Sequence, residues 1–175
     1  MINSIIRHSM FFYRELTKAE VGQAGTNEVY IRLPNNFDYQ TFFGDTPQSN
    51  EDGNTKISFV AFNTSQRTNN SEKVTLKFVY YRNNSNKEKR IPSLRELFRD
   101  NNVDIGDIVC LESRNIDGTY TFYLRFFKKG TIQIDPSSFS FTLIEDEAKK
   151  DIITTDKEIF SHQIIYYGAP GTGKS

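Results

Sequence analysis

Hydrophobic and polar residues alternate along most of this chain in short runs, which is the pattern of half-buried β-strands. In the clearest run one face carries Val74, Leu76, Phe78 and Tyr80, and polar side chains dominate the other. The expected strands are residues 11–16, 29–33, 57–62, 73–81, 108–112, 119–128 and 138–144. Residues 48–55 and 63–72 are polar and are expected to form loops, and residues 115–118 a turn.

Two short segments have helical rather than alternating spacing. Residues 37–43 predict a brief helix. Ser93 is a favoured residue type for a helix N-cap, and the following Leu94, Leu97 and Phe98 would share one helical face.

Thr17 and Glu20 have the Ser/Thr-x-x-Glu spacing of a capping box, so a helical turn is expected to begin at Thr17. Seven short strands with two small helices and no internal repeat are typical of a closed or half-closed barrel. We therefore expect a mainly β fold, a seven-stranded open pseudobarrel with two short helices over residues 1–145. A charged linker at 146–162 would then lead to residues 163–175, the start of a truncated second domain.

The single cysteine, Cys110, excludes an internal disulfide and suits a reducing compartment; we expect it to be a small core residue. No stretch of about 18 apolar residues is present, and Arg7 and His8 interrupt the apolar start. We expect a soluble cytoplasmic protein with no membrane partner. Neither His8 nor His162 has a partner at metal or triad spacing, so no metal site and no catalytic residue are predicted.

The chain carries 22 basic and 22 acidic residues, but the charge is unevenly placed. Residues 145–158 are mainly acidic. A basic stripe spans Lys73, Lys77, Arg82, Lys87, Lys89 and Arg90. A local concentration of cations matters more for binding a phosphate backbone than the total charge does.

Residues 168–175 read GAPGTGKS and match the Walker A pattern G-x-x-x-x-G-K-[ST], after a short apolar strand at 163–167. Its defining positions are Gly168, Gly171, Gly173, Lys174 and Ser175. The glycines let backbone N–H groups face phosphates, the lysine reaches the β- and γ-phosphates, and the serine holds Mg²⁺. The pattern predicts GTP or ATP with Mg²⁺ as cofactor of a longer parent protein. Without the following helix and the Walker B carboxylate, these 175 residues are expected to hold no cofactor and to have no enzymatic activity.

Three stretches resemble the EcoRII-type effector domains, which share the B-three pseudobarrel with plant transcription factors. Residues 15–31, ELTKAEVGQAGTNEVYI, resemble the first DNA-contacting arm, and residues 80–91 resemble the second. Residues 92–98 with 103–109 are similar to that fold's passage from helix to strand. Residues 166–175 resemble the start of an McrB-type AAA+ motor, a GTP-using family. Together they resemble a LlaJI-type, McrBC-related restriction protein.

The resemblance implies site-specific recognition of double-stranded DNA by two arms in the major groove. The first arm would contact DNA through Lys18, Gln23, Thr26, Asn27 and Glu28. The second region would use Lys77, Arg82, Asn83, Asn84, Asn86, Lys87, Glu88, Lys89 and Arg90. Arginine suits guanine, asparagine and glutamine suit adenine, and a carboxylate suits cytosine. Two roles stay open for Glu88, reading cytosine or orienting Arg90 by an ion pair.

Phosphate contacts are assigned to Lys18, Lys73, Lys77 and Lys87. In the parent protein the resemblance implies an McrC-like nuclease subunit and self-assembly through the motor domain. Two other functions stay open for the barrel, docking of a partner protein and reading of a modified base. The latter needs an aromatic pocket, whereas we expect the core to hold Phe59, Phe78, Phe122 and Phe126.

Overall fold

The computed structural model describes residues 7–65, 72–83, 85, 87–135 and 140–143. The expected linker at 146–162 and the Walker A residues at 168–175 lie outside them, as do Asn84 and Asn86. The domain boundaries and the nucleotide site therefore stay predictions.

The described residues form ten strands and two short helices. The strands are β1 (Arg7–Glu15), β2 (Ile31–Leu33), β3 (Gln48–Glu51), β4 (Asn54–Asn63), β5 (Glu72–Tyr80), β6 (Lys89–Ile91), β7 (Ile108–Ile116), β8 (Thr119–Phe127), β9 (Ile132–Asp135) and β10 (Ser140–Leu143). The helices are α1 (Tyr39–Phe43) and α2 (Arg95–Asp100). Within this part of the chain, neither helix has the length and apolar character needed to cross a membrane.

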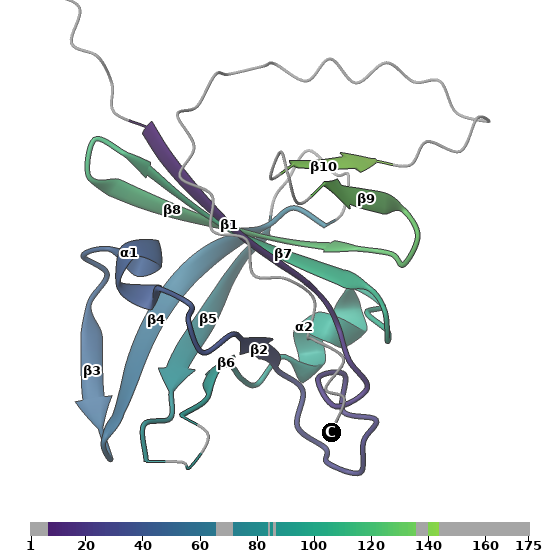
Figure 1. Ribbon diagram of the computed structural model, residues 1–175, viewed down its shortest axis with the longest axis horizontal. Helices are drawn as coiled ribbons and strands as arrows, with labels where there is room; N and C mark the ends of the chain where they lie inside the picture. The colour runs from purple at the N-terminus through teal and green to yellow at the C-terminus, as the bar shows by residue number, and fades with distance from the viewer. Residues whose placement is uncertain (1–6, 66–71, 84, 86, 136–139, 144–175) are drawn as a thin grey trace, which may run out of the picture.

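Eight of these strands form one sheet that curls into an open barrel (Figure 1). The strand order is β1-β7-β8-β4-β5-β6-β2, and β3 is added beside β4. Neighbours are antiparallel except β4 and β8, which run parallel where residues 61–63 face 122–124. β9 and β10 form a separate hairpin. The expected mainly β pseudobarrel, with seven strands along its path and two short helices, is confirmed.

Aromatic side chains fill the barrel, and α1 supplies two of them. Phe42 and Phe43 are buried, and the Phe43 ring lies 4.9 Å from that of Phe59 and 5.2 Å from that of Phe78. The residues expected in the core, Phe59, Phe78, Phe122 and Phe126, are all buried, and Cys110 is a buried free thiol. Alternation along the strands thus identified the core-facing positions correctly.

The expectation of a loop at residues 48–55 is wrong, because this segment holds β3 and the start of β4. All four residues of β3 are exposed, and the strand pairs with β4 only. An exposed edge strand needs no buried face, so its sequence lacks the hydrophobic alternation from which strands are recognised. The short strands β6 and β9 were also missed.

The helix expected after Ser93 exists, but its predicted N-cap is wrong. Ser93 has φ +64° and α2 begins at Arg95, with Leu94 at the cap position. The Leu94 N–H donates to the Val29 carbonyl at 3.0 Å, which ties the start of the helix to another segment of the chain. A tertiary hydrogen bond thus sets the start of α2. Leu94 and Phe98 are buried as expected.

Glu20 closes the gap between β1 and β2, the two ends of the sheet. Its side chain is 1% exposed. One carboxylate oxygen accepts the Thr17 N–H at 3.0 Å and the Thr17 hydroxyl at 2.7 Å. The other accepts the Arg32 N–H at 2.9 Å and lies 3.2 Å from Arg14 Nε. The expected turn begins at Thr17, whose carbonyl accepts the Glu20 and Val21 N–H groups at 3.1 and 3.2 Å. The Thr17–Glu20 spacing also marks a barrel closure.

We expect Glu20→Ala to lower the free energy of unfolding by about 3 kcal/mol, because it leaves Arg14 unpaired at a largely buried site. Chemical denaturation measures the change. Glu15→Ala, which removes an exposed carboxylate from the end of β1, should change stability by less than about 0.5 kcal/mol. Equal losses in the two variants would contradict the closing role of Glu20.

Asp38 caps α1 and makes the stability depend on pH. Hydrogen bonds from the Thr41 hydroxyl and from the backbone lower the pKa of Asp38 below its ordinary value of 3.8. This stabilisation is therefore present above the unfolded pKa and is lost as the pH falls through the lower folded pKa. Asp38→Ala should cost about 1 kcal/mol near neutral pH and less in acid. Thermal unfolding across the acid range checks this, and Asp38→Asn, which keeps an accepting oxygen, should lose less than Asp38→Ala.

Candidate nucleic-acid interface

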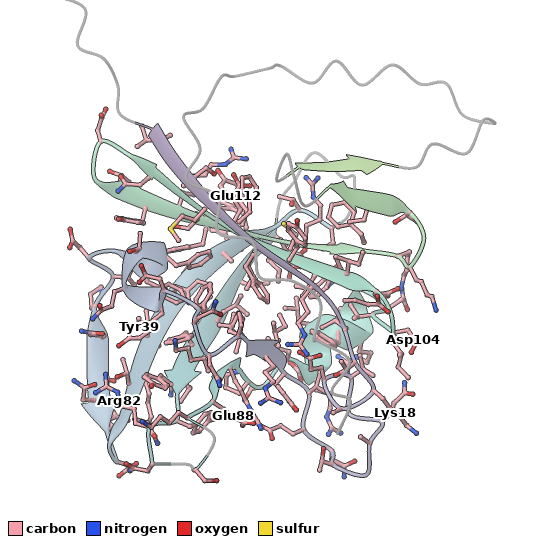
Figure 2. All side chains as sticks on the ribbon, in the orientation of Figure 1. Lys18, Tyr39, Arg82, Glu88, Asp104 and Glu112 are labelled. Atoms are coloured by element: carbon pink, nitrogen blue, oxygen red, sulfur yellow. The ribbon has the colours of Figure 1, made fainter. Side chains whose placement is uncertain are left out.

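Two polar loops project from the same end of the barrel. We define the first arm as residues 17–30 and the second arm as residues 81–88. Figure 1 shows both at the lower end, on either side of β2 and β6, and Figure 2 places Lys18 on one side, Arg82 on the other and Glu88 between them. Because β2 pairs with β6, with Arg32 opposite Arg90, the strands that carry the bases of the arms are held side by side.

The first arm has a fixed base and an exposed tip. Its exposed residues include Lys18, Gln23, Thr26, Asn27 and Glu28. The Tyr30 N–H donates to the Glu20 carbonyl at 3.1 Å, which closes the loop. Gly22 has φ +77°, and a Cβ there would lie 3.0 Å from Val29, so the turn favours glycine. The predicted contact residues of this arm are thus brought together on one exposed loop.

Hydrogen bonds hold the second arm at its base and against the neighbouring β3–β4 turn. The Tyr81 N–H donates to the Glu88 carbonyl at 2.8 Å, and Asn83 Nδ2 donates to the Asp52 carbonyl in the β3–β4 turn at 2.7 Å. Arg82 lies over the Tyr80 ring at 5.3 Å. Arg82, Asn83 and Lys87 are exposed.

A chain of ion pairs, in which arginines and glutamates alternate in space, lies between the two arms. Glu88 pairs with Arg90 and lies 3.4 Å from Arg32, and Arg90 Nη1 lies 3.1 Å from Glu28 Oε2. The Arg90 guanidinium also stacks 4.2 Å from the Tyr30 ring centre. Burial lowers the pKa of Arg90, but the charges of Glu88 and Glu28, the hydrogen bond to Glu88 and the electrostatic interaction with Tyr30 outweigh it and raise the pKa overall. Of the two roles left open for Glu88, the ion pair with Arg90 is therefore present.

The structure places three of the predicted lysines away from the arm tips. Lys89 is buried: its ammonium donates to the Phe37 carbonyl at 2.8 Å and to the Asn35 carbonyl, and burial lowers its pKa. Lys77 lies opposite Ser58 in the middle of β5. Lys73 lies over the Phe62 ring, near the far end of β5. DNA contact by these lysines is untested, and because of their positions we no longer expect them to contact DNA.

Arg32 lies between the two arms, and the sequence analysis did not single it out. Its side chain is 44% exposed on β2, between the arms. The sequence could have indicated its exposure, because Arg32 stands between two apolar strand residues, Ile31 and Leu33, and alternation puts it on the outer face.

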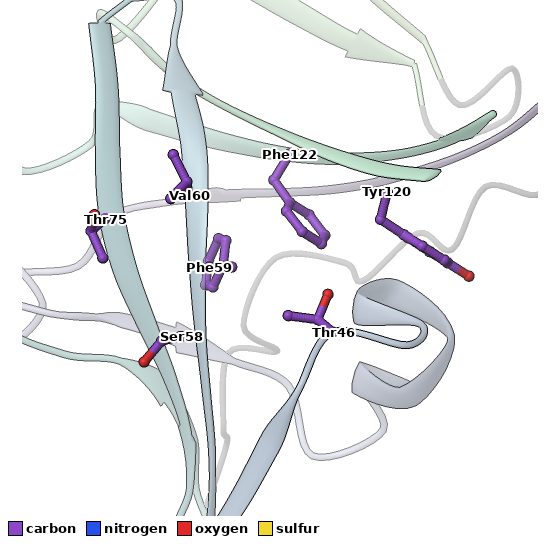
Figure 3. A pocket seen from close by; sticks show the side chains of 7 residues that line it. All are labelled: Thr46, Ser58, Phe59, Val60, Thr75, Tyr120 and Phe122. Carbon is purple, nitrogen blue, oxygen red and sulfur yellow. The ribbon is translucent and has the colours of Figure 1, made fainter. Parts of the chain in front are cut away.

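A hollow of about 360 Å³ lies elsewhere, between β4, β5, β8 and the segment after α1 (Figure 3). It is lined by Thr46, Ser58, Phe59, Val60, Thr75, Tyr120 and Phe122. The rings of Phe59 and Phe122 meet edge to face at 69° and 5.2 Å, so they pack on each other instead of leaving a slot for a base. Its polar groups are hydroxyls, without an amide or carboxylate to read a base edge. This hollow does not fit a modified-base reader.

The described part of the chain contains neither a metal-binding cluster nor a reactive thiol. No three His, Cys, Asp or Glu side chains gather there closely enough to hold a metal ion. Burial raises the pKa of Cys110 to about 12, which keeps the thiol protonated and inert at neutral pH.

No family model matches the chain, and no curated protein matches it. Among solved structures it is similar to the B3 domain of the UbaLAI restriction endonuclease, in a crystal structure with cognate DNA. The identity is 24%, the match covers 70% of this chain and 69% of that chain, and the TM-score is 0.45. A likeness this loose does not support a function by itself.

The contrast between Lys89 and Lys87 gives a test of their separate roles. Lys89→Met should lower the free energy of unfolding by about 1–3 kcal/mol, because two backbone carbonyls lose their donor. Lys87→Met, at an exposed position two residues away, should leave the thermal unfolding temperature unchanged. A stability loss at Lys87 equal to that at Lys89 would contradict this division.

Proposed function

We propose that this chain recognises a specific site in double-stranded DNA by inserting both arms into the major groove, as the targeting module of a restriction system. The observation that carries the proposal is the placement of two polar arms at one end of the barrel, with their bases joined by β2–β6 pairing and by the Arg32–Glu88 ion pair. Arms whose bases are fixed before binding lose less conformational entropy when they dock.

The exposed side chains divide into two kinds by chemistry. Lys18, Arg82 and Lys87 offer cations to phosphates on either side of the groove. The exposed forked side chains that suit base edges are Gln23, Asn27, Glu28 and Asn83, and the partly buried Arg90 adds a guanidinium fork. The arms thus supply both the contacts that position a duplex and those that specify its sequence.

The domain itself is proposed to be non-catalytic. On the Walker A pattern at 168–175 and its resemblance to McrB-type motors, the parent protein would use GTP or ATP with Mg²⁺ in the cytoplasm. It would assemble through its motor and act with an McrC-like nuclease subunit. The barrel would recognise the DNA site, and the nuclease subunit would cleave the DNA.

Fluorescence anisotropy of labelled random-sequence and selected duplexes across a salt series tests the proposal. We expect a selected duplex to bind more tightly than the random pool, with an affinity that falls steeply as salt rises. Lys18→Ala and Lys87→Ala should each reduce the slope of log affinity against log salt by about one.

Lys73→Ala, at the far end of β5, is the matched control and should leave that slope unchanged. Absence of binding to any duplex at low salt would contradict the proposal and favour partner docking. Binding that requires a methylated duplex would favour a modified-base reader instead.

A further inference from the structure

We propose that Glu28 and Arg90 together read one G·C base pair, with Arg90 on the guanine and Glu28 on the cytosine. This inference rests on the proposed function and names the base pair that one part of the interface selects. It follows from a direct ion pair between an exposed carboxylate of the first arm, Glu28, and an arginine at the base of the second, Arg90.

The two side chains differ in exposure and in the number of their contacts, as reading a base pair together would require. Arg90 is 20% exposed and is held from behind by Glu88 and from one face by the Tyr30 ring. Glu28 is 47% exposed and lies at the end of the first arm. The arginine is thus positioned in advance, while the carboxylate is free to swing away from it.

Docking would exchange one set of partners for another without leaving a charge unpaired. In the free protein a Glu28 oxygen accepts from Arg90 Nη1 at 3.1 Å. Guanine presents two acceptors, O6 and N7, which match the arginine fork, and its partner cytosine presents the N4 amino group, which donates to a carboxylate. Both members of the ion pair therefore regain a partner at a G·C pair.

Other base pairs leave repulsive contacts in the same geometry. Adenine would place its N6 amino donor against the guanidinium of Arg90, and thymine would place its O4 acceptor and methyl group against Glu28. A reversed pair would set the cytosine amino group against Arg90 and the guanine acceptors against Glu28. One orientation of one base pair is therefore favoured, and discrimination comes as much from these clashes as from the matched contacts.

Glu88 carries the same charge but cannot take this role. Its side chain is 10% exposed and is held by both Arg32 and Arg90. Moving it into the groove would leave two arginines without their carboxylate. Glu88 is a positioning residue for Arg90.

Selection from a random duplex pool, followed by sequencing of the bound fraction, tests the pairing. Wild type, Glu28→Gln and Arg90→Lys are compared, with Glu72→Gln at the far end of β5 as the matched control. We expect both interface variants to relax the same single base pair and to keep the rest of the site. Replacing that G·C pair by A·T should weaken wild-type binding about 5- to 150-fold and Glu28→Gln binding much less.

A selected site identical in wild type and Glu28→Gln would overturn the inference. So would relaxation of different base pairs by Glu28→Gln and Arg90→Lys. Failure of the wild type to select any sequence would contradict the proposed function itself, which separates the two failures. Unchanged thermal unfolding of Glu28→Gln, expected for its exposed site, shows that a lost preference reflects recognition and not folding.

Discussion

The buried carboxylate of Glu20 is the contact on which the arrangement of both arms depends. A charge out of water is costly unless it is paired and its hydrogen bonds are satisfied. Here Thr17 and the Arg32 N–H donate hydrogen bonds to the carboxylate, and Arg14 pairs with its charge. Those partners lie after β1, on β1 and on β2, so one group joins the two ends of the open sheet. The first arm begins and ends at this point, because the Tyr30 N–H returns to the Glu20 carbonyl.

Arg32 connects this closure to the second arm. Its N–H donates to Glu20, its carbonyl accepts from Arg14 at 3.2 Å, and its guanidinium pairs with Glu88. Glu88 in turn orients Arg90. The bases of the two arms are therefore coupled through Glu20, Arg32, Glu88 and Arg90.

Alternation in the sequence identified the long strands because their inner faces are apolar, as in β4 and β5. It missed β3, which buries neither face, and β6, where Lys89 occupies a buried position beside Tyr80 and Tyr39. The Thr17–Glu20 spacing pointed to a real local contact. Its larger role depends on Arg14 and Arg32, which only the folded chain brings near.

The sequence also cannot distinguish the two glutamates of the candidate interface. Glu28 and Glu88 have the same charge, but Glu28 is exposed and Glu88 is largely buried. Sequence reasoning placed both on DNA-contacting arms, but only three-dimensional partners decide which carboxylate is free to move. If the proposed function holds, paired carboxylates would also explain how a chain of zero net charge recognises DNA. Non-specific binding arises mainly from unpaired cations facing phosphates. Under the proposed function, arginines that stay neutralised until a matching base edge replaces the carboxylate would keep that background low and raise the ratio of specific to non-specific binding.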